Sequence, residues 1–155
     1  MPTVLVAAAW ISLALHASVL TWIDARTHRL PNRWVASCAL VGIVLMGAAG
    51  WSAGDTSAFT RGLLVGTAAS SIFLLIHLCG GMGMGDVKYV WVLGFYLGTL
   101  GFDTAWWGLW SSFALASLVI LVRRWRRGSP RVARIPFGPF LTLGTAIAAA
   151  TFVMS

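Results

Sequence analysis

Six long stretches of this 155-residue chain are almost free of charged residues, and short polar segments separate them. They cover residues 4–23, 34–50, 62–79, 87–102, 104–122 and 137–154. About twenty apolar residues form a helix of roughly 30 Å, which matches the hydrocarbon core of a bilayer. Only 10% of the residues are charged, against roughly 25% in soluble domains. The pattern predicts an all-α integral membrane protein, with six transmembrane helices in a single domain over residues 1–155.

The basic residues gather at one end of the predicted helices. Ten of the eleven Lys and Arg follow the first, third and fifth stretches, whereas only Arg61 lies in the opposite loops. Since cytoplasmic loops carry the excess of Lys and Arg, we expect a multi-pass protein of the inner or plasma membrane with both termini on the extracytoplasmic side. Tryptophan prefers the membrane interface, and six tryptophans lie near predicted helix ends: Trp22, Trp34, Trp51, Trp106, Trp107 and Trp125.

The net charge of +7 would suggest a nucleic-acid partner in a soluble protein. Here the positive charge lies in the loops of a predicted membrane protein, so we expect no nucleic-acid partner. The six arginines of residues 123–134 are expected to bind anionic lipid at the cytoplasmic face. Cys38 and Cys79 lie far apart without CxxC spacing, so we expect buried, unreactive thiols, no metal site and no cofactor.

The four acidic residues are all aspartates, and the topology sorts them into two pairs. Asp24 ends the first stretch and Asp86 opens the fourth, so both lie on the cytoplasmic side. Asp55 and Asp103 lie in the opposite loops. Asp86 also closes the run Gly-Gly-Met-Gly-Met-Gly-Asp at 80–86, and a charge at membrane depth costs about 2.5–3.5 kcal/mol on insertion scales. Asp24 and Asp86 are therefore the pair that two neighbouring helices can bring together.

Two carboxylates that meet share one proton, because both cannot ionise easily. In such a pair the ionised carboxylate takes a proton from an attacking water, and the protonated one donates to the developing oxyanion. Gly83 and Gly85 would let a substrate strand approach the backbone without meeting a Cβ. The residues leave open which aspartate has which role.

Two other interpretations of the pair remain open at this point. Each aspartate could cap a helix, which explains Asp86 at a helix start but not Asp24 at the negative end of its helix. The pair could also relay protons in a small transporter or proton channel. Transporters usually have internal repeats and sites near the midplane, neither of which the sequence shows.

Several further residues are candidates for shaping the site. Lys88 is expected to orient Asp86, to contact substrate or to anchor the helix in the membrane. Asn32 is expected to hydrogen-bond near the pair or to begin the second helix, where Pro31 fits the first turn. Pro136, Gly138 and Pro139 are expected to shape the start of the last helix rather than to touch substrate.

Three segments together resemble the prepilin peptidase family, the GxGD-type intramembrane aspartic peptidases. They are Asp24 with Leu30-Pro31-Asn32, then Gly83-Met84-Gly85-Asp86-Val87-Lys88, then Ile135-Pro136-Phe137-Gly138-Pro139-Phe140. They occur in the family's order and at the corresponding helix ends, so the resemblance extends over the six-helix layout of the whole chain.

The resemblance implies that Asp24 and Asp86 are the catalytic pair and that the substrates are type IV pilin-like precursors. Members of the family cut at the cytoplasmic face, after a glycine that precedes the apolar helix of the precursor. Many also carry a cytoplasmic insertion with paired CxxC motifs, which methylates the new amino terminus using S-adenosylmethionine. This chain lacks the insertion, so we expect peptidase activity without methyltransferase activity. The short form resembles the peptidases of Flp/Tad-type pili, with archaellin-type precursors as the alternative.

Overall fold

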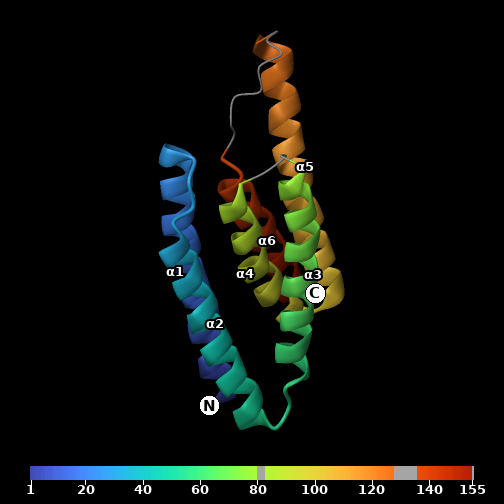
Figure 1. Cartoon of the computed structure of the whole chain (residues 1–155). Coiled ribbons are helices and arrows are strands. Elements are labelled where there is room, and N and C mark those ends of the chain that lie inside the picture. The colour runs from blue at the N-terminus through green and yellow to red at the C-terminus, as the bar shows by residue number, and fades with distance from the viewer. Residues whose placement is uncertain (80–82, 128–135, 155) are drawn as a thin grey trace.

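The computed structural model describes residues 1–79, 83–127 and 136–154, which form six α-helices and contain no strand. The helices are α1 (Pro2–Thr27), α2 (Asn32–Ala53), α3 (Ser57–Leu78), α4 (Met84–Leu100), α5 (Phe102–Arg127) and α6 (Gly138–Met154). Successive helices run in opposite directions between the two ends of the bundle (Figure 1). Three of them, α1, α2 and α3, are long and apolar enough to cross a membrane, and α6 is a shorter apolar helix. The prediction of an all-helical fold is confirmed.

α1, α2 and α5 extend beyond the predicted apolar stretches at both ends, because backbone hydrogen bonding continues into the flanking polar residues. α1 ends at Thr27, and the N–H of its C-cap residue His28, which has left-handed backbone (φ 52°, ψ 36°), donates to the carbonyl of Asp24. Asp24 therefore lies in the last turn of α1 and not after it. Asp86 lies in the first turn of α4, because Gly83 is extended and the helix begins immediately after it.

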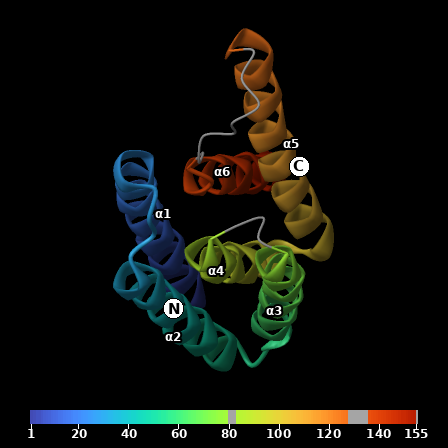
Figure 2. The same cartoon turned by 45° about the horizontal axis from the view of Figure 1, so that its top comes forward.

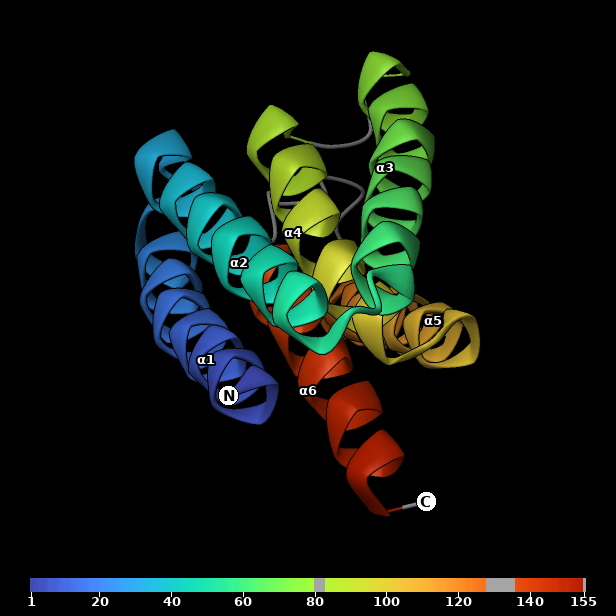
Figure 3. The same ribbon diagram turned by 90° about the horizontal axis from the view of Figure 1, so that it is seen from below.

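α4 lies at the centre of the bundle and packs against α2, α3, α5 and α6 (Figure 2). α1 and α2 lie side by side as a hairpin, with α4 between α2 and α3 (Figure 3). Ten of the seventeen residues of α4 are buried. Protein therefore surrounds most of α4, which is about 25 Å long.

Four glycines bring α3 and α4 unusually close together. Gly62 and Gly66 of α3 face Gly94 and Gly98 of α4, so the backbones meet without intervening side chains. A Cβ on Gly98 would lie 2.9 Å from the Cα of Gly62, and one on Gly66 would lie 2.8 Å from the carbonyl oxygen of Trp91. Small residues four positions apart are typical of helix pairs in membranes, where close van der Waals contact drives association.

Gly98→Ala is expected to lower the free energy of unfolding by about 1–3 kcal/mol, the usual effect of overpacking. The new Cβ would lie 2.8 Å from the Cβ of Val65 and 2.9 Å from the Cα of Gly62, and neither atom can rotate away. Thermal unfolding in detergent measures the change. Gly47→Ala is the matched control, because its Cβ would lie 3.5 Å from the ring of Phe59, an ordinary contact. Equal destabilisation by both variants would contradict the packing argument.

Arg61, the one basic residue that the sequence assigns to the opposite loops, stabilises the C-terminus of α4. Its Nε donates to the carbonyl of Gly98 at 2.9 Å, and its Nη2 donates to that of Thr99 at 3.0 Å. Unpaired carbonyls and the negative end of the helix dipole favour a cation at this position. The arginine that departs from the charge pattern thus has a structural role.

The outer surface of the bundle is largely apolar. Exposed side chains along the helices include Ile11, Leu40, Leu64 and Leu118, and the six tryptophans near the predicted helix ends are also exposed. The Arg26 guanidinium lies over the ring of one of them, Trp22, 4.4 Å from its centroid. An apolar exterior of this extent marks a surface that meets lipid or protein rather than water. These features support a membrane-embedded protein.

Cys38 is buried as expected, but Cys79 is exposed, so the expectation of a buried thiol is wrong there. The reason is that α3 ends at Leu78 and Cys79 lies beyond its packed part. Of the six arginines expected to bind lipid, four lie in the last turns of α5, and Arg131 and Arg134 lie outside the described residues, as do Gly80, Gly81 and Met82.

Candidate active site

The last turn of α1 and the first turns of α4 and α6 lie at one end of the bundle (Figure 1). Asp24 and Asp86 are thereby brought within electrostatic reach of each other. Asp55 lies in the turn between α2 and α3 and Asp103 in the first turn of α5, at the other end. The alternating direction of the helices therefore places Asp24 and Asp86 at one end and Asp55 and Asp103 at the other, as the sequence predicts.

Asp24 is held by the start of α6. Its side chain is 3% exposed, and its Oδ2 accepts the backbone N–H of Gly138 at 2.9 Å. Gly138 is the first residue of α6, where an N–H has no partner within the helix and the dipole favours a negative charge. Asp24 is badly placed to cap its own helix, and it caps α6 instead.

Only glycine fits at position 138 in this arrangement. A Cβ there would lie 2.8 Å from Oδ2 of Asp24 and 3.3 Å from its Cγ. We expected Gly138 to shape the start of the last helix, but its contact with Asp24 was not predicted. The two residues are 114 positions apart, and nothing in the local sequence of either one indicates the other.

Asp86 is more open than Asp24. It lies in the first turn of α4, it is half-buried, and the backbone N–H of Gly83 donates to its carboxylate. A Cβ on Gly83 would lie 3.2 Å from Oδ2 of Asp86. The pair is therefore asymmetric: Asp24 is enclosed and fixed by α6, whereas Asp86 is partly accessible from the end of the bundle. Such a pair can present one carboxylate to water while the other stays shielded.

At Gly85 the second of the three segments that resemble the family packs closely against the first, which contains Leu30. A Cβ on Gly85 would lie 3.1 Å from the Cβ of Leu30 and 3.5 Å from its carbonyl oxygen. The connector between α1 and α2 thus crosses the start of α4 at Gly85. Pro31 then precedes the first residue of α2, and its carbonyl accepts the N–H groups of Trp34 and Val35.

Lys88 and Asn32 are paired with each other. Nζ of Lys88 donates to Oδ1 of Asn32 at 3.2 Å, and the contact is exposed. It links α4 to the start of α2 beside the aspartate pair. Both roles expected for Asn32 agree with this geometry, because it hydrogen-bonds Lys88 and is also the first residue of α2.

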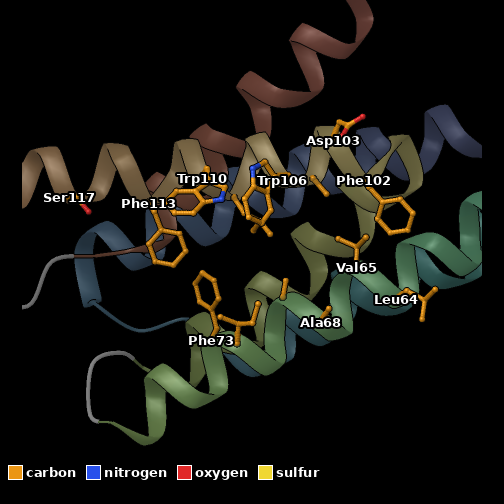
Figure 4. A pocket seen from close by; sticks show the side chains of 14 residues that line it. Leu64, Val65, Ala68, Phe73, Phe102, Asp103, Trp106, Trp110, Phe113 and Ser117 are labelled. Atoms are coloured by element: carbon orange, nitrogen blue, oxygen red, sulfur yellow. The ribbon is translucent and has the colours of Figure 1, made fainter.

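A large apolar hollow lies elsewhere, between α3 and α5 (Figure 4). Its volume is about 990 Å³, and its walls include Phe73, Trp106, Trp110 and Phe113. Neither Asp24 nor Asp86 lines it. Size alone therefore does not identify the reactive site in this fold, and the candidate site is the aspartate pair at the end of the bundle.

Comparison with known proteins identifies the same family as the three sequence segments. No significant match was found among curated proteins or among solved structures. The sequence model of the type IV leader peptidase family matches residues 11–154, which include both aspartates, the start of α4 and the start of α6. A match over nearly the whole chain confirms the resemblance seen in the three segments. This protein belongs to the type IV leader peptidase family.

Proposed function

We propose that this protein is an intramembrane aspartic endopeptidase that removes the leader from type IV pilin-like precursors, with Asp24 and Asp86 as its catalytic pair. The observation that carries the proposal is that the last turn of α1, with Asp24, and the first turn of α4, with Asp86, lie at the same end of an apolar bundle (Figure 1). Family membership supports a peptidase of the aspartic type. The arrangement supplies the two groups that such a reaction requires.

Hydrolysis by the pair uses one ionised and one protonated carboxyl group. The ionised group accepts a proton from water as the water oxygen bonds to the scissile carbonyl carbon. The protonated group donates to the carbonyl oxygen, which would otherwise become an oxyanion. When the intermediate collapses, the C–N bond breaks, the leaving amine takes a proton from the first carboxyl, and the hydroxyl returns its proton to the second. Both groups are then in their starting states.

We assign the pair to the cytoplasmic boundary of a protein with six spans and both termini outside. The ten basic residues of the sequence on that side support this orientation. A precursor whose apolar helix lies in the bilayer would present the residues just before that helix at this depth. We infer short Flp/Tad-type precursors as substrates, and we expect no methylation of the product, because the chain has no insertion with paired CxxC motifs.

The experiment is cleavage of a synthetic precursor by the purified protein in proteoliposomes. The precursor has a basic leader, a glycine and an apolar helix, and mass spectrometry follows its products. We expect a single cut after the glycine and a product mass that S-adenosylmethionine leaves unchanged. A precursor with valine in place of that glycine is the control substrate and should remain intact. Failure of the folded, reconstituted protein to cut the glycine precursor would overturn the proposal.

A further inference from the structure

Three hydroxyl side chains from three helices meet just below the aspartate pair. Oγ1 of Thr142, in α6, lies 2.7 Å from the hydroxyl of Tyr89 in α4 and 3.0 Å from Oγ1 of Thr21 in α1. These are the same three helices that carry Asp86, Asp24 and Gly138. The hydroxyl cluster therefore connects every helix that contributes to the candidate site.

The sequence spacing puts this hydroxyl cluster one helical turn from the site. Each member lies three or four positions from a residue of the site: Thr21 before Asp24, Tyr89 after Asp86, and Thr142 after Gly138. Residues at these spacings share one face of a helix. One turn corresponds to about 5 Å along the axis, so the hydroxyl cluster lies directly behind the carboxylates, toward the interior of the bundle.

The number of hydroxyl protons available as donors places Thr142 at the centre of the cluster. Its hydroxyl donates to the carbonyl of Gly138 at 3.0 Å, and a carbonyl can only accept. A threonine hydroxyl has one proton and two acceptor sites, so Tyr89 and Thr21 both donate to Thr142. The hydrogen-bonding capacity of Thr142 is then filled, and all three helices are tied to one oxygen atom.

Burial of the Tyr89 hydroxyl makes the hydrogen bonds of the cluster costly to break. Tyr89 is fully buried, and a buried hydroxyl without a partner is costly. In an apolar interior, hydrogen bonds are also stronger than in water. Thr21 and Thr142 are half-buried. Displacing α4 or α6 would leave the buried hydroxyl of Tyr89 without its partner, so the hydroxyl cluster resists such displacement.

We propose that Thr142 is a positioning residue that sets the separation of Asp24 and Asp86 by holding α1, α4 and α6 together one turn behind them. The inference rests on the proposed function, because it takes the two aspartates as the catalytic pair. A misplacement of about 1 Å at a catalytic group can reduce a rate about 100-fold. Thr142 touches neither substrate nor the reacting atoms, so its effect passes through the two carboxylates.

The test compares Thr142→Val with Thr142→Ser in the reconstituted protein. Thr142→Val keeps the shape of the side chain but removes the acceptor, and we expect kcat to fall about 10- to 100-fold. KM should change little, because no group that binds substrate is lost. Thr142→Ser keeps the hydroxyl and should restore most of kcat. A loss that arose from shape or from general stability would not be rescued in this way.

Thr145→Val is the matched control on the same helix. Thr145 is buried, whereas Thr142 is half-buried. The hydroxyl of Thr145 bonds within α6, to the carbonyl of Leu141 at 2.9 Å. The chemical change is identical, so kcat should stay at the wild-type value. An equal fall in kcat for Thr145→Val and Thr142→Val would overturn the inference.

A double-mutant cycle tests whether Tyr89 acts through Thr142. Tyr89→Phe removes one donor and should lower kcat about 3- to 10-fold. The double variant with Thr142→Val should be no slower than Thr142→Val alone, because the shared bond is already absent. Additive losses would overturn the inference. If Thr142→Val fails to fold, a wild-type kcat for Tyr89→Phe would also overturn it.

The asparagine variants of the two aspartates separate this inference from the proposed function. Inactive Asp24→Asn and Asp86→Asn together with a wild-type kcat for Thr142→Val would refute the positioning role alone. Full cleavage by Asp24→Asn would refute the proposed function, and with it the positioning role.

Discussion

Asp24→Asn and Asp86→Asn are each expected to lower the rate of precursor cleavage by about 10²–10⁴-fold, the usual contribution of a general acid or base. Asparagine cannot ionise, so neither variant can hold the shared proton. Asparagine does keep an oxygen that accepts hydrogen bonds. The contact from Gly138 to position 24 and that from Gly83 to position 86 can therefore both survive. The substitution thus removes the chemistry while keeping the caps.

Cleavage of a co-expressed precursor, resolved by gel shift, measures this loss, and membrane insertion is followed in parallel. Asp103→Asn is the matched control, since Asp103 lies in the first turn of α5 at the far end of the bundle. It should cleave at the wild-type rate. Intact processing by Asp24→Asn or by Asp86→Asn would remove the peptidase mechanism.

Asp24→Ala distinguishes the two roles of Asp24. Alanine removes the acceptor as well as the charge, so the N–H of Gly138 loses its buried partner. We expect Asp24→Ala to be about 1–3 kcal/mol less stable than Asp24→Asn, with both variants inactive. Equal stability of the two variants would show that capping of α6 by Asp24 contributes little to the fold.

Gly138→Ala is the second variant with a large expected effect. A Cβ at this position would lie 2.8 Å from Oδ2 of Asp24, so either the carboxylate or the start of α6 must move. A shift of about 1 Å at a catalytic carboxylate is expected to reduce kcat about 100-fold. Cleavage kinetics in proteoliposomes measure the loss.

The control for Gly138→Ala is Gly47→Ala in α2, where the added Cβ makes only an ordinary contact with Phe59. It should cleave at the wild-type rate. Thermal unfolding shows whether Gly138→Ala is still folded when activity is lost. Wild-type cleavage by Gly138→Ala would mean that the contact between Gly138 and Asp24 does not hold the carboxylate in its reactive position.

The grouping of the four aspartates was predictable, because the side of the bundle on which a helix end lies follows from counting helices. Because successive helices alternate in direction, the end of an odd-numbered helix and the start of an even-numbered helix lie on the same side, whatever their packing. Asp24 at the end of the first helix and Asp86 at the start of the fourth must therefore lie on one side. The same count separates Asp55 and Asp103 from them. No knowledge of neighbouring helices was needed for this.

The contacts that hold the site were not predictable in this way. The helices are apolar on nearly every face, because lipid and protein interior both favour apolar side chains, so no amphipathic pattern shows which faces pack together. The contact between Gly138 and Asp24 requires α6 to lie beside α1, although these helices are at opposite ends of the chain. The same is true of Thr142 with Thr21, and of Gly85 with Leu30.

By itself, the sequence determined the helical class, the shared end of the two aspartates and, through three short segments, the family. Apolar length, loop charge and local motifs encode these properties directly. Only the tertiary structure decided that Asp24 is enclosed by the start of α6, that Asp86 remains partly open, and that Thr142 joins three helices behind them. Those features depend on which helices are neighbours, and in an apolar chain that choice is made by glycine contacts and a few hydrogen bonds between residues far apart in sequence.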